Sequence, residues 1–173
     1  AVVRRISIGD DPELLIEHLR EEYETFAPDI IITSGGISHG KYEVVRNAIA
    51  MAPSLGLPIP LSWFGHVSQQ PGGPQGVNVL DFNGHRLPMI SFPGNPVSTL
   101  ISYVLMLRPY LRAGGPYGTP HEVASRMATL ENAPRGVLVI DKPLTAPANK
   151  RQFLRGNLAM VESEPGTYRV ELY

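Results

Sequence analysis

The sequence predicts an α/β fold, in which a doubly wound, three-layer domain is followed by a small, incomplete β domain. Two observations lead to this prediction. Apolar runs at residues 29–32 and 87–92 each end in a glycine-rich turn that opens a helical segment, and such strand–turn–helix units build doubly wound sheets. From residue 122 onward, short apolar stretches alternate with turns, which indicates β-structure. We place the α/β domain at residues 1–115 and the partial β domain at residues 120–173.

The composition limits the possible classes of protein. The chain has 173 residues, which suits one domain with a small appendage. Its net charge is −1 and it has no run of Lys or Arg, so we expect no nucleic-acid partner. It contains no Cys, which excludes disulfides and Cys-based metal sites and suits a cytoplasmic protein. Its apolar stretches are too short to cross a bilayer, so we expect no membrane partner.

The N-terminal part alternates between strand and helix signals. Residues 2–8 are rich in Val and Ile and suit a strand. Asp11 is placed to cap a helix that begins at Pro12, because Asp accepts hydrogen bonds from the free N–H groups at a helix start. Residues 30–32 are three isoleucines, which predicts a strand buried on both faces of a parallel sheet. A second helix is expected over residues 42–51.

The central part predicts a hairpin and a long helix. A mixed strand signal covers residues 58–67, and residues 69–76 predict a loop. An Asn-Gly pair at 83–84 separates two apolar runs, which is the strongest short-range signal for a hairpin. Asn95 is placed to cap a helix over residues 95–111. Apolar residues occur nearly all round that helix, so we expect it to be well buried.

Two loops carry most of the functional signal. Residues 33–40 (Thr-Ser-Gly-Gly-Ile-Ser-His-Gly) and residues 92–98 (Phe-Pro-Gly-Asn-Pro-Val-Ser) each join a strand to a helix. Glycine allows positive φ and close approach of the backbone, so each turn directs N–H groups toward one point. Such groups bind anions, and phosphate above all. We therefore predict that the turns around Gly35 and Gly94 converge on a shared anionic ligand.

Each loop also has a purely structural interpretation. The first is also typical of a tight strand-to-helix turn, and the second of a capped helix start, although we favour binding for both. Ser34 and Ser38 are either hydroxyl donors to phosphate or helix caps, and Asn95 is expected to cap its helix in either case. The candidate binding residues are Thr33, Ser34, Gly35, Gly36, Ser38 and Gly40 in the first loop, and Pro93, Gly94, Asn95, Pro96 and Ser98 in the second.

Taken in order, these loops resemble those of the molybdopterin molybdenumtransferase family, to which the E domain of gephyrin belongs. The matching segments are residues 32–40, a Pro-Gly-x-Pro loop at 71–74, the Asn-Gly hairpin, and residues 93–98. Residues 151–156 are similar to the opening of the family's C-terminal β domain. The resemblance therefore identifies the first 115 residues with the family's molybdopterin-binding α/β domain.

The resemblance implies an activity and a set of ligands. Members of the family insert molybdate into adenylylated molybdopterin and release AMP in a Mg²⁺-dependent step, and they act as homodimers. We therefore expect a molybdopterin-type small molecule and molybdate as partners, and a homodimer when the protein is full length. Pro71, Gly72 and Pro74 join the expected binding residues. Because the family's earlier domains and the first strand of its α/β domain are missing here, we expect the chain to be a fragment.

Two positions depart from the family pattern. The family has acidic residues where this chain has Lys41 and Glu43. Glu43 keeps a carboxylate, the ligand that Mg²⁺ prefers, and is the expected metal ligand, whereas Lys41 either holds a phosphate directly or is a solvated residue. Both are the candidate catalytic residues. The family's Lys in the Pro-Gly-x-Pro loop is Gly73 here, and one hypothesis is that Lys41 supplies the missing charge.

These departures leave more than one function open. The first is a molybdopterin molybdenumtransferase, whose catalysis rests mainly on positioning and electrostatics. The second is a catalytically decayed module of the same fold that binds a pterin or nucleotide, or serves as a scaffold; Lys41 and Gly73 favour it. A related molybdopterin adenylyltransferase is a third, weaker interpretation, because that family normally lacks the C-terminal β segment.

Overall fold

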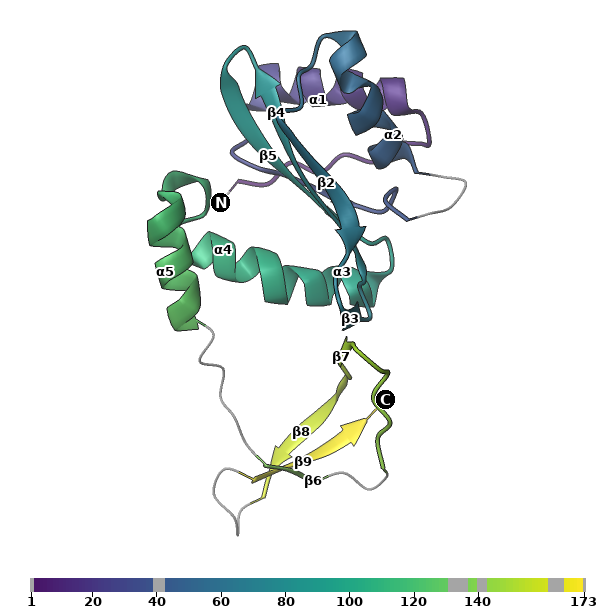
Figure 1. The fold of residues 1–173 in the computed structure, drawn as a ribbon, viewed down its shortest axis with the longest axis vertical. Coiled ribbons are helices and arrows are strands. Elements are labelled where there is room, and N and C mark those ends of the chain that lie inside the picture. The colour runs from purple at the N-terminus through teal and green to yellow at the C-terminus, as the bar shows by residue number, and fades with distance from the viewer. Residues whose placement is uncertain (1, 39–42, 131–136, 140–142, 162–166, 173) are drawn as a thin grey trace. The chain divides into compact units, whose positions relative to one another are not determined.

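The computed structural model describes residues 2–38, 43–130, 137–139, 143–161 and 167–172. The chain divides into two units (Figure 1). The first unit consists of Ala1–Val67 and Gly72–Tyr103, and the second of Ser68–Pro71 and Val104–Tyr173. No helix among the described residues has the length and apolar character needed to span a membrane.

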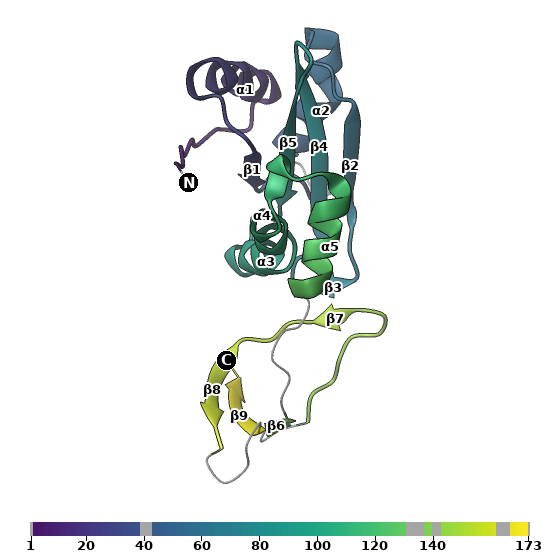
Figure 2. The ribbon, with the colours of Figure 1, turned by 90° about the vertical axis from the view of Figure 1, so that its left-hand side faces the viewer.

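The first unit is built on a four-stranded mixed sheet of order β1-β5-β4-β2, which Figure 2 shows strand by strand. The strands are β1 (Ile31–Ser34), β2 (Leu61–His66), β4 (Pro74–Phe82) and β5 (His85–Phe92). β1 runs parallel to β5, whereas β4 is antiparallel to both β5 and β2. The predicted α/β class is therefore confirmed.

Two helices pack against one face of this sheet. They are α1 (Pro12–Phe26) and α2 (Val44–Met51), and a short 3-10 turn, η1 (Ala52–Leu55), follows α2. Side chains three and four apart on a helix share a face, and alternate side chains on a strand do the same. The helices and the sheet therefore each present one apolar face, and the two faces form a shared core. Its buried members are Leu15, Ile16, Leu19, Ile37, Val45, Ala48, Ile49, Ala52, Leu57, Leu80, Phe82, Leu87 and Met89.

The predicted start of α1 is confirmed. The side chain of Asp11 accepts hydrogen bonds from the N–H groups of Glu13 at 2.9 Å and of Leu14 at 3.2 Å. These N–H groups have no partner within the helix, so the carboxylate satisfies donors that would otherwise need water.

The opposite face of the sheet corrects one prediction. Residues 30–32 were expected to be buried on both faces, yet burial along β1 alternates and Ile32 is 49% exposed. Leu61, Trp63 and Val77 are likewise exposed. The reason is that the core forms on the face covered by α1 and α2, which leaves the side chains of the opposite face more exposed, even on the inner strand β4.

The N-terminal segment also differs from its prediction. Residues 2–9 form no strand, and Val2 and Val3 are 85% and 84% exposed. Their composition suits a strand, but a strand needs a neighbour to satisfy its N–H and C=O groups, and no described segment pairs with them. The prediction of a strand there was wrong for the chain as described.

The predicted hairpin is confirmed. Asn83 and Gly84 have φ of 55° and 92°, the left-handed values that a tight two-residue hairpin turn requires at both positions. The strands are longer than predicted, because β4 already begins at Pro74. Part of the expected loop at 69–76 is therefore strand, including the short β3 (Gln69–Gln70).

The expected long helix is interrupted. It consists of α3 (Pro96–Ser102), a π-helical turn (Tyr103–Leu107) and α4 (Arg108–Arg112). Pro109 lacks an N–H, and its ring collides with the preceding turn of a regular helix, so an extra residue is accommodated there. The prediction of burial all round was wrong, because Leu100 is 59% exposed.

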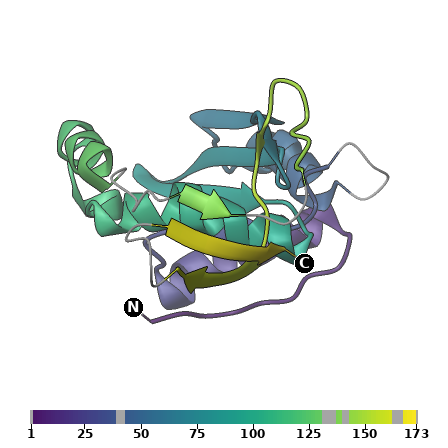
Figure 3. The same ribbon diagram turned by 90° about the horizontal axis from the view of Figure 1, so that it is seen from below.

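The second unit contains helices and a small sheet. After η3 (Gly115–Tyr117) comes α5 (Pro120–Leu130), a helix where the sequence predicted only strands. β3 pairs with β7 (Arg151–Gln152), and a three-stranded sheet of order β6-β9-β8 follows (Figure 3). Its strands are β6 (Val137–Val139), β8 (Gly156–Met160) and β9 (Thr167–Leu172). Strands are thus present in this region, as the sequence predicted, and the placement of the domain boundary stays a prediction.

A capping box explains why α5 is helical. The Glu122 carboxylate accepts hydrogen bonds from the N–H and the hydroxyl of Thr119 at 3.0 and 2.7 Å. The Glu122 N–H in turn donates to the Thr119 hydroxyl at 3.3 Å. This reciprocal pair satisfies N–H groups at the helix start, and Pro120 is well suited to the first turn.

We expect the capping box to weaken in acid. The hydrogen bonds from the Thr119 side chain and backbone lower the pKa of Glu122 below its ordinary value of 4.5. A carboxyl whose folded-state pKa is lowered stabilises the helix above its unfolded pKa, and this contribution disappears as the pH falls through the folded value. NMR titration of the Thr119 and Glu122 amides should show α5 fraying below about pH 4.5. Glu122→Gln should remove that pH dependence, and an identical titration in this variant would contradict the explanation.

Candidate functional site

The two glycine-rich loops begin at the same edge of the sheet. β1 and β5 are parallel neighbours, with Thr33 opposite Ser91 and Ser34 opposite Phe92. The first loop follows Ser34 and the second follows Phe92. Because the carboxyl ends of parallel neighbours lie side by side, the sheet itself brings the loops together (Figure 2).

The backbones of the two turns are in contact. The Gly35 N–H donates to the Phe92 carbonyl at 2.9 Å. A Cβ on Gly94 would lie 3.2 Å from the Gly35 Cα, and a Cβ on Gly35 would lie 3.8 Å from the Gly94 Cα. Gly35 also has a φ of 98°, which side-chain-bearing residues rarely adopt. The turns around Gly35 and Gly94 therefore converge as predicted, and a side chain at either position would strain this close approach.

Two hydroxyl groups tie the loops together. The Ser34 hydroxyl donates to the Pro93 carbonyl at 3.4 Å and lies 3.2 Å from the Thr99 hydroxyl. The Thr99 hydroxyl donates to the same Pro93 carbonyl at 2.5 Å. Ser34, predicted to bind phosphate or to cap a helix, is thus bonded to the second loop. Thr99 was not among the candidates, and its place in the first turn of a helix is the signal that could have found it.

The second loop is organised by Asn95. Its side-chain oxygen accepts hydrogen bonds from the N–H groups of Val97 at 3.0 Å and Ser98 at 3.1 Å, so the predicted cap is confirmed. The Ser98 hydroxyl lies 3.4 Å from the same oxygen. The first N–H groups of α3 are therefore satisfied by the protein. Among the described residues, the N–H groups of Gly36 and Gly94 donate to no backbone carbonyl, so both are candidate donors to an anion.

The first loop contributes residues both to the protein interior and to the surface. Gly36 has a φ of 69°, and a Cβ there would lie 2.8 Å from a Val44 methyl group and 3.0 Å from a Val45 methyl group. Its carbonyl accepts from the Arg46 N–H at 3.3 Å. Ile37 is buried in the core, whereas Ser38 is exposed. Gly36 is therefore needed for contact with α2 whatever the loop binds.

The candidate catalytic residues are only partly described. Glu43 is half-buried at the start of α2 and makes no capping hydrogen bond with its side chain. Lys41 and Gly40, together with His39, lie outside the described residues. In the part of the chain that is described, no three His, Asp or Glu side chains gather into a metal-binding group.

The Pro-Gly-x-Pro loop is divided between the units. Gly72 and Pro74 belong to the first unit and Pro71 to the second. Gly72 is buried with a φ of 94°, and its carbonyl accepts from the Gln75 side chain at 2.8 Å. The Gly73 carbonyl accepts from the Val67 N–H at 2.8 Å. The turn at Gly72 is thus held by β4 on one side and by the end of β2 on the other.

Three buried polar atoms lie close to the loops in the sheet. The Thr33 hydroxyl, the Ser91 hydroxyl and the Asn78 side-chain nitrogen have no hydrogen-bond partner among the described residues. Thr33 and Ser91 are opposite one another in the β1–β5 pair. Water or a ligand is the usual partner of such atoms. Thr33 was among the predicted binding residues, whereas Ser91 and Asn78 were not. A polar residue within an apolar strand is the sequence signal that could have indicated a buried polar atom at these two positions.

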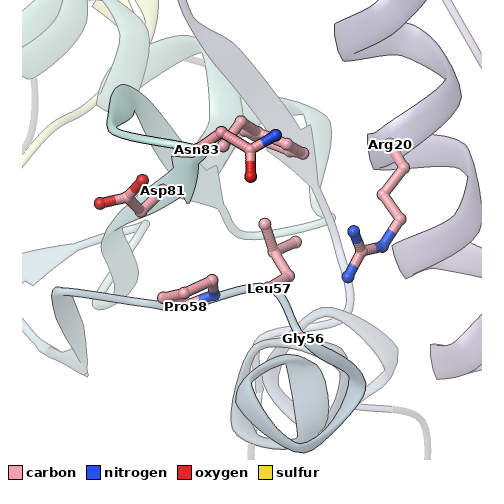
Figure 4. Close-up of a pocket in the computed structure, with 7 residues that line it drawn as sticks. Arg20, Gly56, Leu57, Pro58, Asp81 and Asn83 are labelled. Atoms are coloured by element: carbon pink, nitrogen blue, oxygen red, sulfur yellow. The ribbon is translucent and has the colours of Figure 1, made fainter.

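One cavity lies at the other end of the sheet. Its volume is about 250 Å³, and its lining residues come from α1, the turn after η1, and the β4–β5 hairpin (Figure 4). Arg20 points toward it and donates to the Leu55 carbonyl at 2.7 Å. None of the loop candidates lines this cavity. The lining residues are Arg20, Gly56, Leu57, Pro58, Asp81, Phe82 and Asn83.

Comparison with known proteins identifies related chains. Residues 1–113 match the family described as "Probable molybdopterin binding domain". Molybdopterin molybdenumtransferase 2 of Mycobacterium tuberculosis is 36% identical over 167 residues, which are 96% of this chain and 36% of the relative. Molybdopterin molybdenumtransferase 1 of that organism is 27% identical over 172 residues, 99% of this chain and 35% of the relative. Gephyrin of Dictyostelium discoideum is 32% identical over 102 residues, 52% of this chain and 13% of the relative.

The matches cover almost all of this chain but only part of each molybdenumtransferase. The chain spans about a third of the length of the molybdenumtransferases that it matches. The match to the domain family covers the whole first unit, including both converging loops. The chain belongs to the family of probable molybdopterin-binding domains and is homologous to the molybdopterin molybdenumtransferases.

Proposed function

We propose that this chain supplies the ligand-binding part of an enzyme that inserts molybdate into adenylylated molybdopterin and releases AMP. The observation that carries the proposal is the backbone contact of Gly35 with Gly94. It brings two loops to one edge of the sheet with N–H groups at Gly36 and Gly94 that donate to no backbone carbonyl of the described chain. The names of the homologous transferases support the same reaction.

In this proposal the loops hold the phosphate groups of the ligand. N–H groups fixed by a rigid backbone attract negative charge, and they do not need to reorganise when the ligand binds. The contacts of the Ser34 hydroxyl with the Pro93 carbonyl and the Thr99 hydroxyl fix the distance between the loops. The chain's contribution to the reaction is thus positioning and electrostatic stabilisation.

The residues present are compatible with Mg²⁺ bound together with substrate. Mg²⁺ in nucleotide sites usually takes one or two carboxylates, with phosphate oxygens and water completing its coordination. Glu43 offers one carboxylate whose oxygens make no capping bond, and we propose it as the protein ligand. When bound, the ion would polarise a phosphoryl oxygen and neutralise charge on the leaving group.

We extend the proposal to the assembly and its location. The full-length protein is proposed to act as a homodimer in the cytoplasm, on a molybdopterin-type ligand and molybdate. The resemblance to the transferase family supports the dimer. The absence of Cys from the sequence supports the location.

The contact between the turns gives a direct test of the site. In Gly94→Ala the new Cβ lies 3.2 Å from the Gly35 Cα, so one of the two backbones has to move. Because small displacements of binding groups are costly, we expect the affinity for AMP to fall about tenfold, measured by isothermal titration calorimetry.

Gly84→Ala is the matched control for that test. Gly84 has a φ of 92° in the hairpin turn, with no atom within 4 Å of a Cβ, so alanine strains the backbone far from the loops. We expect a loss of stability of about 1 kcal/mol with unchanged AMP affinity. Equal loss of AMP affinity in both variants would refute a specific role of the Gly35–Gly94 contact.

The role of Glu43 is tested by magnesium dependence. If Glu43 is a ligand, Mg²⁺ should tighten the binding of pyrophosphate to the wild-type chain, and Glu43→Gln should reduce this gain at least about tenfold, because loss of a carboxylate ligand weakens a Mg²⁺ site. Binding in the presence of EDTA should be the same in both proteins. A full magnesium effect in the variant would exclude Glu43 as the ligand.

A catalytically decayed binding module or scaffold is the second candidate. The observation that favours it is the loss of the lysine at Gly73, together with Lys41 in place of an acidic residue. Such a module would bind the pterin or a nucleotide and would not insert the metal. Both candidates predict an anion site, and only the first predicts turnover.

Restoring the family residues distinguishes the two candidates. We expect Lys41→Asp with Gly73→Lys, made in the full-length protein, to raise molybdenum insertion measurably above wild type if the site has decayed, because it returns an oxygen ligand and a cation. The measurement is cofactor formed per active site. No change in turnover, with ligand binding retained, would favour a different function.

A further inference from the structure

Gln75 is a buried polar residue between two of the loops. It lies at the start of β4, directly after the Gly72 turn, and is only 3% exposed. Its side-chain nitrogen donates to the Gly72 carbonyl at 2.8 Å and to the Ser102 hydroxyl at 2.6 Å. Both hydrogens of the amide group are thus used. A buried amide is costly unless it is bonded in this way, so the two partners account for its place here.

The second partner leads to the Asn95 loop. Ser102 is fully buried at the end of α3. Its hydroxyl accepts from Gln75 and donates to the Ser98 carbonyl at 2.8 Å. The Ser98 N–H in turn donates to the Asn95 side chain at 3.1 Å. An unbroken chain of groups therefore runs from the Gly72 turn to the cap of the second loop, entirely within the first unit.

The geometry selects glutamine at position 75. The side-chain amide at this position donates two hydrogen bonds. One goes to a backbone carbonyl three residues earlier, and the other to a hydroxyl 27 residues later in the chain. Asparagine has the same amide on a side chain one methylene shorter, and leucine has similar size with no donor. Hydrogen-bond networks that exclude water specify one arrangement strongly when every member is satisfied.

We propose that Gln75 and Ser102 are positioning residues that couple the Gly72 turn to the Asn95 loop, so that ligand binding at one loop depends on the order of the other. Neither residue touches the ligand. The inference rests on the proposed function for its ligand, and adds a connection between two loops that β1 and β5 do not supply. Gly72 follows β3 and precedes β4, so pairing of the parallel strands leaves its position open.

Matched substitutions in one strand test the proposal. Gln75→Ala and Leu80→Ala each remove a buried side chain from β4, but Leu80 belongs to the apolar core shared with α1 and α2 and is not part of the loops. With AMP as the probe for the 173-residue chain, we expect Gln75→Ala to lower affinity about 3- to 30-fold. Leu80→Ala should leave the affinity unchanged at a comparable or larger loss of thermal stability.

A double-mutant cycle tests whether the two residues act together. Ser102→Ala should lower AMP affinity in the same direction as Gln75→Ala. The double variant should be no weaker than Gln75→Ala alone, because both changes break one path. Losses that simply add, or a Gln75→Ala protein that binds AMP like wild type, would overturn the coupling.

A ligand-free measurement separates this inference from the proposed function. The side-chain amide protons of Gln75 should exchange slowly with solvent, and Asn95→Ala, at the far end of the path, should accelerate their exchange. If the wild-type chain fails to bind AMP, the proposed function is wrong, and the exchange measurement still decides the coupling. Exchange of the Gln75 amide that is unaffected by Asn95→Ala would overturn it.

Discussion

The parallel pairing of β1 with β5 is the interaction on which the rest of the site depends. It places residues 34 and 92 side by side, so the two loops leave the sheet at one edge and in one direction. The contact between Gly35 and Gly94 follows from that pairing and from the absence of side chains on both residues. Neither loop forms a two-sided site alone. The site is a property of two strands that are separated by more than fifty residues in the chain.

Polar side chains hold this arrangement more than apolar packing does. Ser34 and Thr99 share the Pro93 carbonyl, Asn95 satisfies the first N–H groups of α3, and Gln75 connects the Gly72 turn to Ser102. Each bond adds only about 1 kcal/mol net, but an unsatisfied buried group costs as much or more, so alternative arrangements are disfavoured. The apolar core lies on the face of α1 and α2 and includes Ile37 of the first loop, so it anchors that loop directly.

Local signals in the sequence were reliable where one physical requirement decided the outcome. The caps at Asp11 and Asn95, the turn at 83–84 and the glycines of both loops were predicted because each needs a particular side chain or a particular φ. Predictions that depended on neighbours were less successful. Residues 2–8 lack a strand to pair with. Ile32 is exposed because the core forms on the other face of the sheet. The helix α5 depends on the Thr119–Glu122 capping box, which is short and lies among apolar stretches typical of strands.

The sequence by itself determined the class of fold, the family and the identity of the two loops, because those follow from residue order, glycine positions and spacing. Only the tertiary structure decided which donors are free. It showed that Asn95 already occupies the N–H groups of Val97 and Ser98, and that Ser34 bonds to the other loop. It also revealed Gln75 and Ser102 as a connection. Hydrogen-bond partners distant in sequence leave no local periodicity, so their pairing is visible only once the chain has folded.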